Sequence, residues 1–217
     1  MPIRKIGLCY RSVGGRVPMG AGRAAVAVES TLERDFALLQ RFDPDVAGLE
    51  EQPVRIEYLV GRGTKHRYVP DFLVTYRDAG RPPRLVEVKY STDPHLLAGS
   101  LEERFAAARS FAAERGWVFA LATEKEIRSP RLENATFLLP FRDRPPNPAL
   151  RARMLKAAAR APITVQELAD RVAGEDGDRA RVLPSLWTLV ARFELAADLD
   201  RPITMRTMLR HPERGGA

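Results

Sequence analysis

Two carboxylates and one amine stand close together in residues 68–90. Asp71 follows Pro70, and Glu87 and Lys89 are separated by one residue. Carboxylates supply the hard oxygen ligands that Mg²⁺ prefers, and the ion lowers the pKa of a water molecule so that hydroxide is available near neutral pH. A lysine beside them is a positive charge that orients the nucleophile or offsets charge on a phosphate. This combination suits hydrolysis of a phosphodiester.

The surrounding residues predict a β-hairpin that brings the three side chains together. Residues 68–76 and 84–90 alternate between apolar and polar types, and the seven residues between them hold Asp, Gly and two Pro. The period of two places Glu87 and Lys89 on one face of their strand. A strand of the form L-V-E-V-K also fits a one-sided sheet whose Glu and Lys face water, so the motif alone leaves both interpretations open.

Composition limits the class of protein. A chain of 217 residues with 45% apolar residues is long enough for one ordinary core and a smaller second one. No apolar run approaches the roughly 20 residues of a membrane span, and the N-terminus lacks the apolar core of a signal peptide, so we expect no membrane and a cytoplasmic location. The single cysteine, Cys9, excludes an internal disulfide and a thiolate metal cluster. The three histidines, His66, His95 and His211, are too scattered for a metal cluster.

Positive charge is concentrated at the N-terminus. The net charge is +7, and residues 1–28 contain five basic residues and no acidic one: Arg4, Lys5, Arg11, Arg16 and Arg23. This basic arm is either a phosphate-binding element or a solvated tail. Only five of the 35 basic residues are lysines, so a lysine inside the E-x-K triplet favours chemistry, because Arg would serve equally well on a solvated face.

A helix is expected over residues 31–42. Ser30 and Glu33 fit a capping box, apolar residues follow at helical spacing, and the run stops at Asp43-Pro44. In this interpretation the Glu33 carboxylate accepts from the Ser30 backbone N–H and serves the helix cap.

A basic hairpin tip precedes the Pro-Asp strand. The V-R-I-E-Y run ends at a Gly-Arg-Gly turn, and the chain returns through residues 64–68. Arg62, Lys65 and Arg67 are candidates for contacts to DNA phosphates, with a solvated turn as the alternative.

Residues 101–126 add a helix, a strand and a second helix start. An apolar stripe predicts a helix over 101–115, and the nearly continuous apolar run 117–122 is typical of a strand buried on both faces. Thr123 and Glu126 form a second capping box. The element order predicts an α/β fold with a mixed sheet.

The C-terminal third predicts a small helical domain. Residues 142–148 are a Pro-rich linker, helices are expected over 149–160 and 179–192, and Thr164 with Glu167 makes a third capping box. Residues 193–199 and 202–205 are expected to form a wing, which makes the segment similar to a winged helix-turn-helix. Its net charge of +3, from 12 basic and 9 acidic residues, leaves DNA binding and protein docking both open.

The ordered set of motifs in residues 29–128 resembles a known family. The motifs are S-T-L-E-R-D-F, E-Q-P, Y-V-P-D-F, E-V-K and W-V-F-A-L-A-T-E-K-E-I. The Pro-Asp…Glu-x-Lys pattern resembles the PD-(D/E)xK nuclease superfamily, and the whole series is similar to the TnsA endonuclease subunit of heteromeric transposases.

This resemblance implies a fold, a site and a metal. The expected fold is a restriction-endonuclease-like mixed β-sheet flanked by helices. With the arm, the linker and the C-terminal segment taken from the residue patterns above, the expected division is an arm (1–28), a nuclease domain (29–141), a linker (142–148) and a winged-helix-like domain (149–217). The catalytic set is Glu33, Asp71, Glu87 and Lys89, with the three carboxylates as ligands of Mg²⁺, for which Mn²⁺ substitutes. A member of the family has Gln at the position of Glu87.

The function that the resemblance implies is cleavage of double-stranded DNA at the 5′ ends of a transposon. The implied partners are a separate DDE-type transposase and an ATPase regulator of transposition. Two alternatives stay open: a free-standing restriction-like or repair nuclease, and a non-enzymatic DNA-binding adaptor on a nuclease scaffold. Intact Asp71, Glu87 and Lys89 argue against the adaptor.

Overall fold

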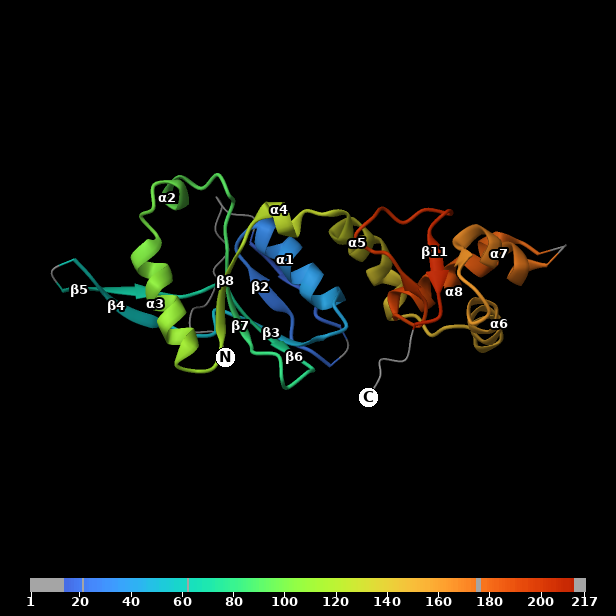
Figure 1. Ribbon diagram of the computed structural model, residues 1–217, viewed down its shortest axis with the longest axis horizontal. Helices are drawn as coiled ribbons and strands as arrows, with labels where there is room; N and C mark the ends of the chain where they lie inside the picture. The colour runs from blue at the N-terminus through green and yellow to red at the C-terminus, as the bar shows by residue number, and fades with distance from the viewer. Residues whose placement is uncertain (1–13, 21, 62, 175–176, 213–217) are drawn as a thin grey trace. The chain divides into compact units, whose positions relative to one another are not determined.

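The chain folds into two compact units, Met1–Arg128 and Ser129–Ala217, in a computed structural model that describes residues 14–20, 22–61, 63–174 and 177–212 (Figure 1). None of the helices in these residues has both the length and the apolar character needed to cross a membrane.

The N-terminal unit is built on a four-stranded mixed sheet of order β3-β6-β7-β8. Strand β6 pairs antiparallel with β3 and with β7, and β7 pairs parallel with β8, so the predicted mixed sheet is confirmed. The elements are β1 (Gly15–Val17), β2 (Val26–Val28), α1 (Thr31–Phe42), β3 (Val46–Glu51), β4 (Ile56–Val60), β5 (Thr64–Tyr68), β6 (Phe72–Tyr76), β7 (Arg84–Val88), α2 (Pro94–Leu97), α3 (Glu102–Ala113), β8 (Val118–Ala122) and α4 (Glu124–Ile127).

Helices α1 and α3 cover opposite faces of this sheet (Figure 1). On the α1 side Phe36 stacks on Phe72 with ring centroids 5.3 Å apart, in one cluster with Val86. On the α3 side Leu73 and Leu85 pack with the alanines of the helix. Side chains alternate along a strand, so the residue after Val86 faces the α3 side.

The predicted hairpin is confirmed, with one change in its first strand. Phe72 lies opposite Val86 in the β6–β7 ladder. The expected strand 68–76 is interrupted, because Tyr68 ends β5 and Pro70 has no backbone N–H to give to a ladder. The interruption leaves Asp71 at the start of β6 rather than inside it.

The prediction that residues 117–122 are buried on both faces was wrong. Among the described residues β8 pairs with β7 alone, at the edge of the sheet, and Val118 is 48% exposed. The apolar run gives no information about where the sheet ends.

Residues 14–20 and 22–28, expected in a basic arm, are part of the folded unit. Strands β1 and β2 pair antiparallel, and Val17, Val26 and Val28 are buried in the cluster beneath α1. The arm residues Arg4, Lys5 and Arg11 lie outside the described residues.

The C-terminal unit contains α5 (Pro130–Arg142), α6 (Pro148–Ala158), β9 (Ile163–Thr164), α7 (Val165–Ala173), α8 (Arg179–Ala191), β10 (Ala196–Ala197) and β11 (Met208–Arg210). The three strands form an antiparallel sheet of order β10-β11-β9. The unit begins before the expected linker, because α5 packs on α8 with Phe137 and Trp187 edge to face at 5.3 Å. The Pro-rich run is therefore a turn between two helices of one unit.

Residues 202–205, expected to form the second strand of the wing, are not a strand. The strand in this part of the chain is β11, a few residues later. The Asn134 side chain donates to the carbonyls of Leu199 and Arg201 and accepts from the N–H of Ile203. The Ile203 N–H is thereby engaged outside a sheet, and the Met205 carbonyl accepts from the backbone N–H of Gln166 in α7 rather than from a neighbouring strand.

Candidate active site

Asp71 lies at the junction of three strands. Its Oδ2 accepts from the backbone N–H of Val88 at 2.7 Å, which ties the start of β6 to the end of β7. Its carbonyl accepts from the backbone N–H of Gln52 at 2.8 Å, just after the end of β3. The Asp71 carboxylate is thus held at the end of the sheet where β7 ends, beside Glu87 and Lys89.

Glu87 and Lys89 meet at the same place. Glu87 is 3% exposed, its Oε1 lies 3.0 Å from the Lys89 Nζ, and its Oε2 accepts from the Tyr68 hydroxyl at 2.7 Å. The backbone N–H of Lys89 donates to the carbonyl of Ala122 at the end of β8. Both side chains are therefore fixed on the α3 side of the sheet, as the period of two predicts.

The electrostatics of these groups show that negative charge is crowded. Burial raises the pKa of Asp71 well above its usual range, and the charges of Glu87 and Glu33 raise it further. Burial opposes the charge of Lys89, but the neighbouring Glu87 and Asp71 outweigh it and raise the pKa of the amine. Burial, and then Glu87, raise the pKa of Tyr68, so its hydroxyl stays neutral and donates.

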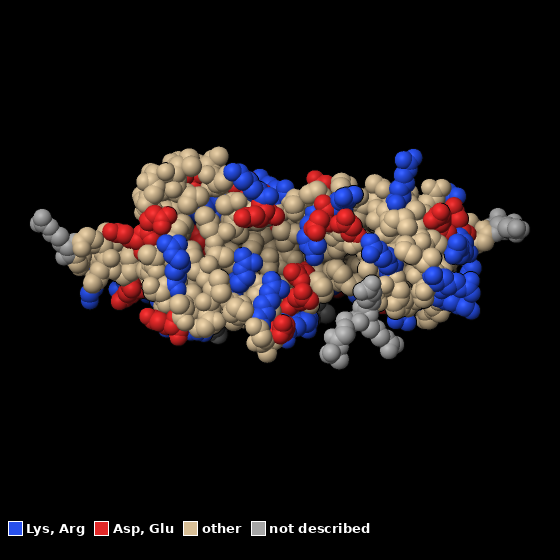
Figure 2. All heavy atoms as spheres, viewed as in Figure 1, with Lys and Arg blue, Asp and Glu red and all other residues tan. Residues whose placement is uncertain are grey.

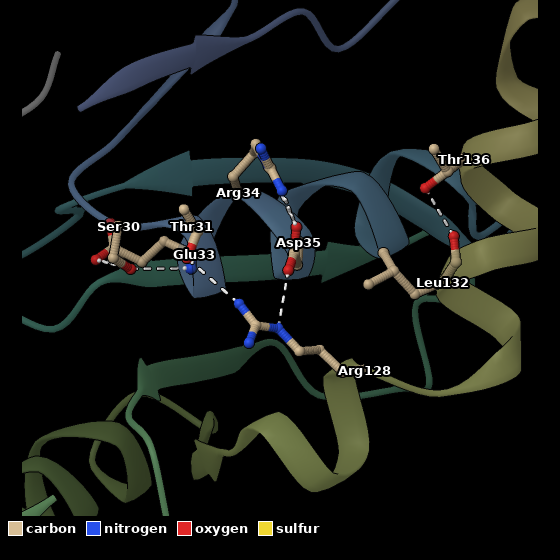
Figure 3. Close-up of polar contacts among 8 residues, drawn as sticks. All are labelled: Ser30, Thr31, Glu33, Arg34, Asp35, Arg128, Leu132 and Thr136. Atoms are coloured by element: carbon tan, nitrogen blue, oxygen red, sulfur yellow. Dashed lines mark hydrogen bonds and ion pairs between the residues drawn. The ribbon is translucent and has the colours of Figure 1, made fainter. Parts of the chain in front are cut away.

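Glu33 is held in the cap of α1 (Figure 3). Its Oε2 accepts from the backbone N–H of Glu29 at 2.7 Å, and its Oε1 accepts from the Ser30 hydroxyl at 3.0 Å. The Ser30 hydroxyl in turn accepts from the Glu33 N–H. The backbone partner is Glu29 and not Ser30 as expected. Burial raises the pKa of Glu33, and its charge acts on Asp71, so it lies near the other carboxylates while it caps the helix.

Arg128 fixes the position of α1 (Figure 3). Its guanidinium binds Asp35 at 3.1 Å and the Thr31 hydroxyl at 3.3 Å, across nearly a hundred residues of sequence. The pair ties the end of α4 to the first turns of α1, beside Glu33. No local sequence pattern marked this contact.

The donor set fits a hard divalent cation. Glu33, Asp71 and Glu87 offer only carboxylate oxygens, and their mutual repulsion is the condition that a bound cation relieves. No three His, Cys, Asp or Glu side chains in the described part of the chain are already arranged as a metal-binding group. Glu87 and Glu33 would have to exchange part of their present contacts for such an ion.

The basic hairpin β4–β5 is a separate two-stranded sheet. Lys65 and Arg67 are exposed on β5, and Arg67 makes an exposed ion pair with Glu57 at 3.3 Å. Arg62 lies outside the described residues. Tyr68, which sequence reasoning used only as a strand residue, ends β5 and connects this hairpin to Glu87.

A glutamine that the sequence analysis used only within the E-Q-P motif also belongs to this region. Gln52 is 8% exposed, and its side-chain amide donates to the carboxylate of Glu29 at 3.1 Å. Its backbone φ of 46° is rare for a residue with a side chain.

We expect Glu33→Gln to separate capping from a role in the metal site. Gln keeps an acceptor for the Glu29 N–H, so stability should change by less than about 1 kcal/mol. A loss of formal charge beside the ion should slow Mg²⁺-dependent cleavage by about 100-fold or more. Thermal unfolding and nicking across a magnesium titration measure both effects.

The control for this variant is Glu167→Gln, since Glu167 also caps a helix: its carboxylate accepts from the backbone N–H of Thr164, the residue before α7. Normal nicking by Glu33→Gln at every magnesium concentration would show that Glu33 caps α1 and has no role in a metal site.

Comparison with known proteins supports a nuclease. Residues 43–124 match the family model described as TnsA-like endonuclease N terminal. The match includes Asp71, Glu87 and Lys89, and Glu33 precedes it. No curated protein matched the chain. The resemblance inferred from the motifs is confirmed over this range.

Proposed function

From the premise that residues 43–124 are a TnsA-like endonuclease N-terminal domain, we propose that the protein is a metal-dependent DNA endonuclease that acts at transposon ends. The single observation that carries the proposal is the convergence of Asp71, Glu87 and Lys89 at one end of β6 and β7. A catalytic set with these residue types at one point suits phosphodiester hydrolysis better than a solvated sheet face, because Glu87 is 3% exposed.

Each side chain has a distinct role in this proposal. Asp71, Glu87 and Glu33 hold a Mg²⁺ ion, which Mn²⁺ replaces. When bound, the ion supplies positive charge against the phosphate and lowers the pKa of the attacking water. Lys89 offsets negative charge that grows on the phosphate in the transition state, and its raised pKa keeps it protonated. Tyr68 holds the Glu87 carboxylate in one orientation through its hydroxyl.

The proposed fold of the N-terminal unit is restriction-endonuclease-like. Its support is the mixed sheet with a helix layer on each face and the catalytic residues at one end of the central strands β6 and β7.

We propose a winged-helix fold for the C-terminal unit. Its support is the element order from α6 to β11 and the sheet order β10-β11-β9. In α8, every residue from 186 to 191 is buried, and Trp187 contacts α5, so only the first turns of this helix, where Arg179 and Arg181 are exposed, are open to DNA.

The basic surface of this unit lies elsewhere. Basic side chains gather over α6 and α7 (Figure 2), and a pocket of about 190 Å³ is lined by Arg153, Lys156, Arg160 and Arg171. None of the four has an ion-pair partner among the described residues. Four unpaired cations around one pocket support contact with DNA phosphates rather than base reading.

The proposed partners follow from the family. A TnsA-like nuclease cuts one strand at its 5′ end, a separate DDE-type transposase cuts the other strand, and an ATPase regulator controls the reaction.

Nicking of labelled transposon-end DNA, with and without the partner transposase, tests this proposal. We expect Mg²⁺-dependent cutting that requires the transposase. Cutting of the same DNA by this protein alone would favour the free-standing nuclease, and absence of cutting in every condition would favour the adaptor.

The exposed hairpin gives a separate prediction about DNA affinity. Lys65→Ala with Arg67→Ala should weaken binding of the full chain to duplex DNA, and the slope of log K against log salt should fall by about 1.8, since each phosphate contact contributes about 0.9. Fluorescence anisotropy at several salt concentrations measures the slope.

The control is Arg81→Gln with Arg109→Gln, which removes two exposed charges from the β6–β7 turn and from α3. An unchanged slope in the hairpin variant would show that Lys65 and Arg67 belong to a solvated turn.

A further inference from the structure

Gln52 has two features that are unfavourable for the free energy of folding. It adopts a φ of 46°, a left-handed conformation that strains a residue with a Cβ. Its Oε1 is buried and has no hydrogen-bond partner among the described residues, although buried polar atoms are almost always paired. Features of this kind persist where they serve a function.

The orientation of the Gln52 amide follows from its neighbour. The carboxylate of Glu29 only accepts hydrogen bonds, so the amide nitrogen must face it, and this nitrogen lies 3.1 Å from the Glu29 Oε1. The unpaired oxygen is therefore a consequence of the bond to Glu29 and not of an arbitrary choice between the two amide atoms.

Gln52 makes two of three consecutive hydrogen bonds that lead from Asp71 to Glu33. Its backbone N–H donates to the Asp71 carbonyl at 2.8 Å, and its side chain donates to Glu29. The Glu29 backbone N–H donates to the Glu33 carboxylate at 2.7 Å. The series connects β6 to the first turn of α1 and thus connects two of the three carboxylates of the proposed metal site.

This connection opposes a repulsion that the site creates. Asp71 and Glu33 come from elements 38 residues apart in sequence, and their like charges drive them apart when no cation lies between them. A bridge from the backbone carbonyl of Asp71 to the carboxylate of Glu33 keeps the two residues together before the ion arrives. Outer groups that orient ligands in this way commonly raise metal affinity by about 10–100-fold.

We propose that Gln52 is a positioning residue for the divalent metal, which holds Asp71 and Glu33 at the spacing that the ion requires through its bond to Glu29. The inference rests on the proposed nuclease function. It assigns a role to the E-Q-P motif, whose middle residue is Gln52.

Gln52→Gly tests the bridge without adding backbone strain. Gly adopts the positive φ readily and keeps the backbone bond to Asp71, so only the side-chain connection is lost. We expect the Kd for Mn²⁺, measured by calorimetry on the full chain without DNA, to rise about 10-fold, while the unfolding temperature stays within a few degrees of wild type. Cleavage should recover at high Mn²⁺ concentration, because the variant loses metal affinity and not a reacting group.

Glu29→Ala removes the other end of the same bridge. It should weaken Mn²⁺ binding by a similar factor, and the double variant should be no weaker than either single variant, since one connection cannot be removed twice. Effects that multiply would overturn the proposal. A normal Mn²⁺ affinity with a lowered unfolding temperature in Gln52→Gly would also overturn it and leave Gln52 a purely structural residue.

Asp71→Asn in the same titration distinguishes this inference from the proposed function. If Asp71→Asn abolishes Mn²⁺ binding and Gln52→Gly does not change it, the positioning role of Gln52 is rejected and the proposed metal site is retained. If Asp71→Asn binds Mn²⁺ as the wild type does, the proposed metal site is itself rejected.

Discussion

Asp71→Asn should abolish cleavage and leave the folded chain at least as stable as the wild type. Asn still accepts from the Val88 N–H, so the bond between β6 and β7 remains. It removes a charge that burial, Glu87 and Glu33 all disfavour, so the unfolding temperature without metal should be equal or higher. We expect nicking to fall by more than about 100-fold, because even outer groups of a metal site cost 10–100-fold.

The matched control is Asp78→Asn. Asp78 also accepts from one backbone N–H, that of Gly80, but it lies in the exposed turn between β6 and β7. This variant should cut at the wild-type rate. Cutting by Asp71→Asn at a tenth of the wild-type rate or more would exclude Asp71 from the site.

Lys89→Met should reduce both stability and cleavage. It leaves the Glu87 carboxylate, 3% exposed, without the amine that lies 3.0 Å away. Because the Lys89 side chain is 28% exposed and water reaches the pair, we expect a loss of about 1–3 kcal/mol in the free energy of unfolding rather than the larger cost of a fully buried pair. If Lys89 offsets charge on the phosphate as proposed, its removal should slow nicking by about 100-fold or more.

A second substitution separates these two effects. In the double variant Glu87→Gln with Lys89→Met, Gln still accepts from the Tyr68 hydroxyl, and residue 87 no longer carries a charge that needs the amine. Urea unfolding should return to near the wild-type free energy, and nicking should stay low. Recovery of nicking in the double variant would show that neither the Lys89 amine nor the Glu87 carboxylate takes part in the chemistry.

Several features of this protein were determined by local sequence. Helix α1 spans the predicted residues because Ser30 caps it and Asp43-Pro44 ends it. The capping boxes of α4 and α7 are present as predicted, since each needs only residues three apart. The period of two correctly placed Glu87 and Lys89 on one strand face. These features depend on contacts within a few residues, and such contacts can be read from spacing alone.

Only the tertiary structure decided which residues meet across long distances. The bond of Arg128 to Asp35, the Tyr68 hydroxyl on Glu87 and the bridge through Gln52 join elements separated by about 20 to 90 residues. No local pattern encodes them, because each depends on strand order and on where the sheet ends. The same reason explains the exposed β8, the folded residues 14–20 and 22–28 and the place of α5 in the C-terminal unit: an apolar run or a Pro-rich turn has the same sequence whether or not another element covers it.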